Sequence, residues 1–194
     1  MADPTGRVAF ERKQMLKVRA ALLDGLKKSD QDADLSAFFE SCGAYLLWAQ
    51  QRLFLQDQTI YDLLDPRVPE TEGQAHRLLG ELNDGLETCR GLAATYKAAV
   101  EDLRGDEQAG QDAFRAATEH FFDEAVRAMP GGRNPLERWT EEYFTPQDWE
   151  TVVHLNDEVI AEEERLFAAV VYSAPEGIDP ASYEVFHPKA LSSA

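Results

Sequence analysis

The sequence predicts an all-α protein: an antiparallel up-down-up-down four-helix bundle with an additional C-terminal helix and an extended tail. Apolar residues recur at three- and four-residue steps over four long stretches, which is the spacing of one face of an α-helix. Breaks rich in proline and glycine separate these stretches, and short connections favour antiparallel neighbours. Strand and hairpin signals are nearly absent. A chain of 194 residues corresponds to one domain.

Four long helices follow from the apolar stripes. The first is expected at about 7–28 and the second at about 35–64, where "LLDPRVPE" ends it because proline disfavours helix in the residue before it. The third, at about 70–104, has the clearest stripe, with the near-heptad spacing of helices that cross at a shallow angle. The fourth is expected at about 108–129 and is stopped by "PGGRNP".

The C-terminal part begins with a short helical piece, "LERWTEEYF", and continues as one helix over about 146–173. Thr145 is a good helix cap, and proline suits the first turn that follows it. Residues 1–173 are therefore expected to form a single domain. The tail, 174–194, has three prolines and no helical stripe, so it is an extended arm or disordered. Its apolar residues are able to dock it onto the bundle; they are Tyr183, Val185 and Phe186.

Charge and composition exclude several classes of partner. The chain has 36 acidic and 19 basic residues, a formal charge of −17. Such a surface repels nucleic acids and anionic lipids. No stretch reaches the roughly 20 apolar residues that span a membrane. The first residues lack the apolar core of a signal peptide, and two well-separated cysteines suit a reducing compartment. We therefore expect a cytoplasmic protein.

Polar residues on a buried stripe are candidates for a site. On the second predicted helix, Arg52 and Gln56 continue the stripe between Ala49 and Ile60, so both are expected to point inward. A buried arginine needs a partner, because an unpaired buried charge is very unfavourable. Its head either reaches an acidic residue on a neighbouring helix or holds a charged ligand.

A second candidate lies in "EHFFDEAVRAMPGG". His120 and Glu124 are one turn apart on the fourth predicted helix and share a face. Such a pair can bind a cation, hold the histidine in a chosen tautomer, or lie on the surface. On the third predicted helix, His76 flanks the apolar stripe. Trp48 on the second is an aromatic residue for the core or for a ligand.

At "HFFDEAVRAMP" the chain resembles the hemerythrin-like, HHE cation-binding family. That family's last bundle helix carries a histidine, an acidic residue about one turn later, and an apolar-Pro ending. His120, Glu124, Met129 and Pro130 match this pattern. "GQAHRLLGELNDGL" is similar to the third helix, with His76 in the place of a metal-binding histidine. The resemblance covers roughly residues 8–170 and implies a bundle with a pocket between its helices.

The chain departs from that family at most metal-ligand positions. Arg52 and Gln56 stand where the second helix has a histidine and a bridging glutamate. Methionine or leucine stands where the first helix has a histidine. A diiron site is therefore not expected. If any metal binds, the resemblance leaves one ligand set, for a single iron ion: His76, His120 and Glu124.

Three functions stay open. The first is a cofactor-independent enzyme or binder that uses the pocket for non-redox acid/base chemistry of the lyase, isomerase or cyclase type. His120 would be the acid or base, oriented by Glu124, facing Arg52 across a shared cavity. A small molecule with a polar or anionic group would be held by four residues: Arg52, Gln56, His76 and Trp48. The second function is a mononuclear iron protein of oxygen or redox chemistry. The third is a non-catalytic regulatory or interaction bundle.

Overall fold

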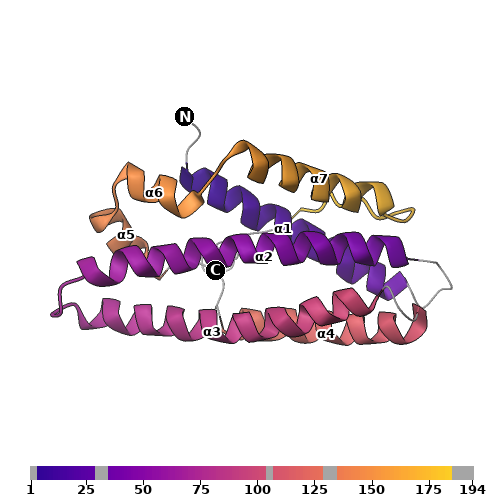
Figure 1. Cartoon of the computed structure of the whole chain (residues 1–194), viewed down its shortest axis with the longest axis horizontal. Helices are drawn as coiled ribbons and strands as arrows, with labels where there is room; N and C mark the ends of the chain where they lie inside the picture. Colours follow the sequence, from indigo (N-terminus) through magenta and orange to yellow (C-terminus); the bar gives the residue numbers. More distant parts are fainter. Residues whose placement is uncertain (1–3, 29–34, 104–106, 129–134, 185–194) are drawn as a thin grey trace, which may run out of the picture.

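The structure is a computed structural model that describes residues 4–28, 35–103, 107–128 and 135–184. In these ranges the regular elements are helices, and no residue lies in a strand, so the all-α prediction is confirmed. Consecutive long helices run up and down against one another, which is consistent with a helical bundle (Figure 1). Within the same ranges, no helix combines the length and the apolar character needed to cross a membrane.

The helix bounds agree with the apolar stripes to within a few residues. The long helices are α1 (Pro4–Lys28), α2 (Ser36–Leu64), α3 (Gly73–Asp102) and α4 (Glu107–Ala128). A 3-10 turn joins α2 to α3; it is η2 (Asp65–Arg67). The C-terminal part holds three shorter helices, which are α5 (Glu137–Tyr143), α6 (Pro146–Val153) and α7 (Asp157–Ser173).

The prediction of one continuous helix over 146–173 is wrong, because the chain breaks at His154. This residue has a left-handed backbone with φ 43° and ends α6. Two residues later, the side chain of Asn156 accepts a hydrogen bond from the backbone N–H of Val159 and caps α7. Acidic residues in the first turn of α7 favour the positive end of that helix. The sequence "HLNDE" therefore contains a capping signal of its own.

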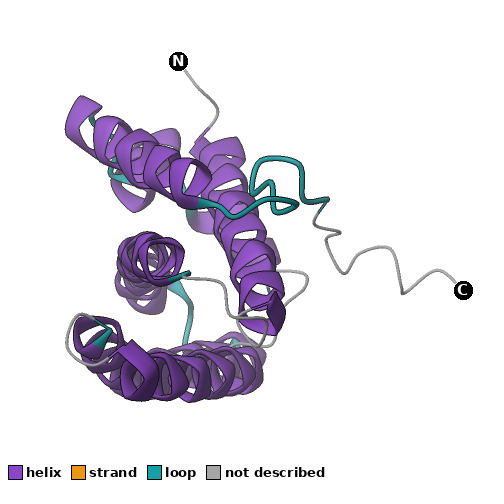
Figure 2. Cartoon of the chain, turned by 90° about the vertical axis from the view of Figure 1, so that its right-hand side faces the viewer, coloured by secondary structure: helices purple, strands orange, loops and turns teal. Residues whose placement is uncertain are grey.

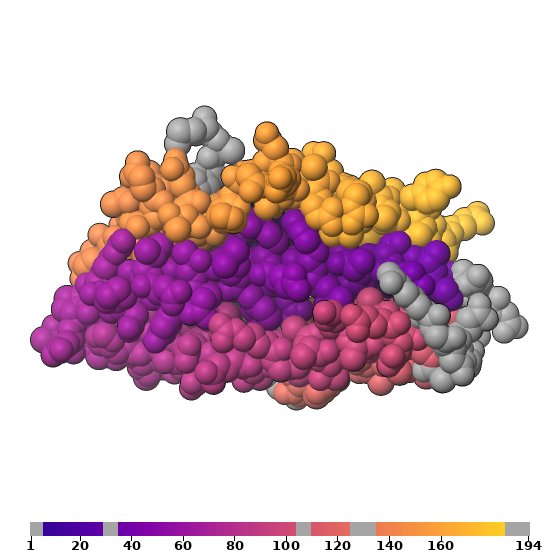
Figure 3. All heavy atoms as spheres, viewed as in Figure 1, coloured from indigo at the N-terminus to yellow at the C-terminus, as the bar shows by residue number. Residues whose placement is uncertain are grey.

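Helix α2 is the central element of the fold. Helices α1, α3, α6 and α7 all pack against it, and α4 packs mainly on α3 (Figures 1 and 2). In the space-filling view, the segments from α5 to α7 cover one long side of the molecule (Figure 3). A polar residue on α2 can therefore meet partners from several segments that lie far apart in the sequence.

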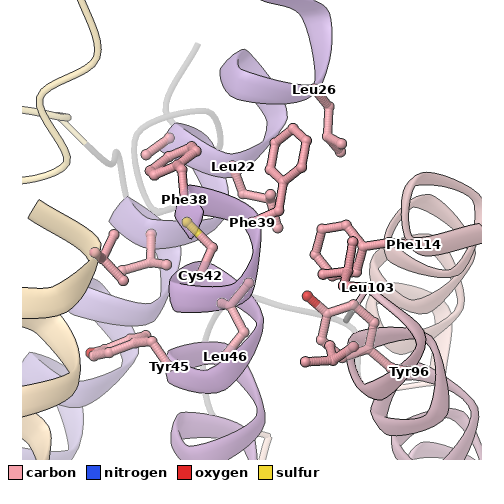
Figure 4. Close-up of a cluster of buried hydrophobic side chains, with 14 of the residues drawn as sticks. Leu22, Leu26, Phe38, Phe39, Cys42, Tyr45, Leu46, Tyr96, Leu103 and Phe114 are labelled. Carbon is pink, nitrogen blue, oxygen red and sulfur yellow. The ribbon is translucent and has the colours of Figure 1, made fainter. Parts of the chain in front are cut away.

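One apolar cluster fills the half of the bundle that contains the start of α2. Its centre is a set of aromatic rings, in which Phe114 lies 5.8 Å from both Phe39 and Tyr96 between ring centroids (Figure 4). Helices α2 and α3 come close here because Gly43 has no side chain. A Cβ atom at that position would lie 2.9 Å from a methyl group of Val100.

A second apolar cluster fills the other half of the bundle. It joins the end of α2 to the start of α3 and to α5 and α6, and includes Ile60, Leu64, Ala75, Leu79, Trp139 and Val152. On α2, the first cluster ends at Ala49 and the second begins at Ile60. Between them lie Arg52 and Gln56, both buried as the stripe predicted. The interior of the bundle is therefore interrupted by polar side chains at this level.

Candidate functional site

We call the polar side chains at this level the buried polar layer, and it consists of Arg7, Glu11, Arg52, Gln56 and Glu163. The first two lie on α1, the next two on α2 and the last on α7. Gln56 is fully buried, and Arg52 is 7% exposed. Glu11 and Glu163 are buried as well. Two cationic and two anionic side chains thus share one water-poor region.

Glu11 is the centre of the layer. Its Oε1 atom accepts hydrogen bonds from Arg7 Nε at 3.0 Å and from Arg52 Nη2 at 3.1 Å. Its Oε2 atom accepts from Gln56 Nε2 at 2.7 Å. Charge-assisted hydrogen bonds of this kind are stronger than neutral ones. Both oxygens of the carboxylate are therefore used within the protein.

The remaining terminal donors of Arg52 bind the end of α6. Nη2 donates to the backbone oxygen of Val153 at 2.6 Å, and Nη1 donates to that of His154 at 3.3 Å. The last carbonyls of a helix have no partner inside the helix and carry partial negative charge. A guanidinium suits both requirements. Of the two alternatives for Arg52, the acidic partner on a neighbouring helix is confirmed, and it is Glu11.

Glu163 connects α7 to the layer through an ion pair with Arg7. Burial raises the pKa of Glu163; the charge of Arg7 opposes this rise, and the nearby Glu11 adds to it. Burial also raises the pKa of the neighbouring Tyr45 hydroxyl, with smaller contributions from Glu163 and Glu11. The layer therefore favours a neutral tyrosine and makes ionisation of Glu163 less favourable.

Four buried polar atoms in and beside the layer have no hydrogen-bond partner within the part of the chain that the structure describes. They are Arg52 Nε, Gln56 Oε1, Glu163 Oε1 and the hydroxyl of Tyr45. Buried polar atoms are normally paired. Two of these atoms donate or can donate, and two accept, so they could bond to small polar molecules.

The predicted acid/base pair lies elsewhere. His120 is exposed on α4, and Glu124 is half-buried one turn further on. Helix α4 instead turns another stripe inward, which contains Phe114, Thr118, Phe121 and Phe122. The prediction that Arg52 faces His120 across a shared cavity is therefore wrong. The hydrogen-bond partners of Arg52 lie on α1 and at the end of α6.

His76 and Trp48 have other neighbours. His76 is partly exposed at the start of α3, where its Nε2 lies 3.2 Å from the backbone oxygen of Pro69. Its Nδ1 is 3.8 Å from a carboxylate oxygen of Asp65, so it bridges the connection between α2 and α3. Trp48 is half-buried and packs against Tyr45, with ring centroids 6.1 Å apart. The structure does not bring these two residues together.

The ligand set considered for a single iron ion is not assembled. His76 lies 26 residues before the end of α3, and His120 lies 13 residues into α4. In an antiparallel pair this difference separates them by about 20 Å along the bundle, at 1.5 Å per residue. Across the described ranges, no three histidine, cysteine, aspartate or glutamate side chains gather in a way that could hold a metal ion.

Sequence reasoning missed Arg7, Glu11 and Glu163. Glu11 had a detectable signal, since it falls between Val8 and Met15 on the apolar stripe of the first helix. Glu163 similarly lies three residues before Leu166, a buried residue of α7.

Comparison with known proteins does not assign a family or a function to the chain. The resemblance to the hemerythrin-like family stays a prediction. No family model, no curated protein and no solved structure matches the chain.

Proposed function

We propose that this chain is a non-catalytic helical bundle that acts by binding a protein partner, and that its buried polar layer is structural. One observation carries the proposal. The guanidinium expected to hold a substrate is bound by Glu11 and by the end of α6. These contacts join α1, α2 and α6, so they stabilise the arrangement of the helices.

The position of His120 supports the same proposal. A general acid or base has to come within about 2.6–3.2 Å of the proton that it transfers, or reach it through one water molecule. His120 is exposed on α4, whereas Arg52 and Gln56 are buried against α1. An acid/base reaction that uses all of these residues would require a rearrangement of the bundle.

The resemblance to the hemerythrin-like family is compatible with this proposal if the chain has lost that family's metal-binding function. In that reading, Arg52 and Gln56 replace a histidine and a bridging glutamate. The positive charge inside the bundle then belongs to a guanidinium, and Glu11 neutralises it. The interior charge would be balanced by side chains of the chain itself.

A small-molecule enzyme or binder is the second candidate, and one observation favours it. Arg52 Nε, Gln56 Oε1, Glu163 Oε1 and the Tyr45 hydroxyl are buried without partners in the described structure. A small polar ligand that reached the layer could satisfy several of them. In this candidate, Arg52 and Gln56 keep their predicted binding role, and His120 and Glu124 take no part.

A thermal-shift screen distinguishes the two candidates. The wild-type chain is heated with Fe²⁺, other divalent cations, and small carboxylates and phosphates. A compound that binds the buried polar layer would raise the melting temperature of the wild type and of His120→Gln, but not that of Arg52→Met or Gln56→Leu. The proposal expects that no compound gives this pattern. A compound that gives such a shift would overturn the proposal in favour of the small-molecule binder. The matched control is Gln58→Leu, which changes a less buried glutamine on the same helix.

A further inference from the structure

The contact between α2 and α7 contains two buried polar atoms that have no hydrogen-bond partner within the described parts of the chain. One is the hydroxyl of Tyr45 on α2, and the other is Oε1 of Glu163 on α7. Tyr45 is fully buried, and Glu163 is 5% exposed. Unpaired polar atoms are unfavourable inside a protein, so each of these two atoms needs a hydrogen bond.

The packing of α2 on α7 brings the two residues to neighbouring levels. The helices run antiparallel, because Tyr45 packs on Phe167 at 5.9 Å between ring centroids, whereas Arg52 bonds to the residues just before α7. Figure 4 shows the side chain of Tyr45 extending from α2 toward α7. Glu163 lies one turn before Phe167, so in this register it stands opposite Ala49, one turn after Tyr45. Ala49 is buried and contributes only a methyl group at this level.

The electrostatics of the layer also connect the two groups. Burial is the main cause of the raised pKa of the Tyr45 hydroxyl, and the charges of Glu163 and Glu11 add to it. Glu11 already accepts three hydrogen bonds within the layer and uses both of its oxygens. Glu163 uses Oε2, which binds Arg7. The carboxylate oxygen that remains for a donor beside Tyr45 is therefore Oε1 of Glu163.

The charge balance of the layer indicates a neutral occupant for this position. Arg7 and Arg52 carry positive charges. Glu11 and Glu163 carry negative charges, so the layer as a whole is neutral. An added ion would bring an uncompensated charge into a buried region, which is very unfavourable. A large neutral molecule would have to separate α7 from α2, because Tyr45 and Glu163 are buried between them. Water is the smallest neutral molecule that both donates and accepts hydrogen bonds.

We propose that the contact between α2 and α7 is a binding site for an ordered water molecule, held by the Tyr45 hydroxyl and by Oε1 of Glu163. The hydroxyl donates to the water oxygen, and the water donates to the carboxylate. Buried water commonly pairs polar groups that the protein itself leaves unsatisfied. This inference rests on the proposed function, because it completes the hydrogen bonding of a layer whose role is structural.

Tyr45→Phe tests the site, because it removes the hydroxyl and keeps the ring on Phe167. Loss of a hydrogen bond of average strength should lower the melting temperature by about 2–4 °C in a chain of this length. If the hydroxyl is instead unpaired, its removal should leave the melting temperature unchanged or raise it. Tyr172→Phe is the control, since this side chain is 94% exposed, and it should change nothing.

A double-mutant cycle shows whether the hydroxyl acts through Glu163. Glu163→Met keeps a side chain of similar length and removes the acceptor. In that background, Tyr45→Phe should lower the melting temperature much less, because the water has already lost its second partner. Circular dichroism checks that each variant folds. An equal fall in both backgrounds would overturn the site.

A crystal structure of the wild-type chain tests the site without any variant. At a resolution that shows ordered waters, density for one should lie within about 3.2 Å of both the Tyr45 hydroxyl and Oε1 of Glu163. Three observations would overturn the proposal: a direct hydrogen bond between the two side chains, the absence of density between them, or density for a larger molecule.

The two proposals fail separately. Absence of the water removes this site but leaves the structural role of the pair between Arg52 and Glu11. A small molecule that stabilises the chain through Arg52 and Gln56 removes the proposed function, whether or not the water is bound.

Discussion

Arg52 on α2 donates to Glu11 on α1 over 3.1 Å, and the same guanidinium nitrogen donates to the last residue of α6 over 2.6 Å. One side chain thus connects three helices. Both partners of the ion pair are buried, with side-chain exposures of 7% and 3%. Loss of either partner leaves charge or carbonyl groups unsatisfied inside the bundle.

Arg52→Met should therefore destabilise the chain. Removal of one partner of a buried pair typically costs about 3–5 kcal/mol, and we expect the lower end because Glu11 keeps Arg7 and Gln56. Urea unfolding followed by circular dichroism measures this change. Arg77→Met, which breaks an exposed pair with Glu81, is the control and should change stability little. An unchanged or higher stability of Arg52→Met would contradict the structural role.

Glu163→Gln should change how stability depends on pH. The pKa of Glu163 is raised in the folded protein, so the folded state binds the proton more tightly than the unfolded state does. Above the raised pKa, Glu163 is ionised in the folded protein, and its buried charge lowers the free energy of unfolding. As the pH falls from the raised pKa to the ordinary glutamate pKa, the folded protein takes up the proton and this loss of stability disappears. Unfolding followed from neutral pH down to the ordinary glutamate pKa should show that Glu163→Gln loses this gain on acidification. The exposed neighbour Glu164→Gln should keep it; identical pH profiles for Glu163→Gln and the wild type would refute the assignment.

Asp148→Ala should loosen the start of α6. Asp148 accepts hydrogen bonds from both terminal nitrogens of Arg67 and from the backbone of Thr145, which completes a capping box. Arg67, and then Thr145, hold the pKa of Asp148 below its usual value. The stability that it contributes is therefore present above the ordinary aspartate pKa and is lost as pH falls through the lower one. Hydrogen exchange at pH 7 should be faster in α6 of the variant, and unchanged in the control Glu150→Ala, at an exposed position of the same helix.

Gly43→Ala and Gly80→Ala should act in opposite directions. Both replace a helical glycine, which by propensity alone stabilises a helix by about 1 kcal/mol. At Gly43 the new methyl group would lie 2.9 Å from the stiff side chain of Val100, and such overpacking costs about 1–3 kcal/mol. At Gly80 it meets nothing within 4 Å. Melting temperatures should fall for the first variant and rise for the second; a rise for both would show that α2 and α3 can separate freely.

The periodicity of the sequence determined where the long helices begin and end, and it placed Arg52 and Gln56 inside. Periodicity succeeds here because a helix buries one stripe wherever it packs. It failed at His154, where a local cap interrupts a stripe that continues on both sides. Of the residues predicted to dock the tail, Tyr183 does pack onto the bundle, while Val185 and Phe186 lie outside the described residues.

The partners of the inward residues were decided only by the tertiary structure. Whether Arg52 meets Glu11 or His120 depends on which helix faces that side of α2, and no spacing along a single helix contains this information. On α4 the apolar periodicity itself indicates which face is buried, because Phe114 and Phe121 recur at helical spacing. Their rings lie in the core against Tyr96, and His120, on another face of the helix, is exposed.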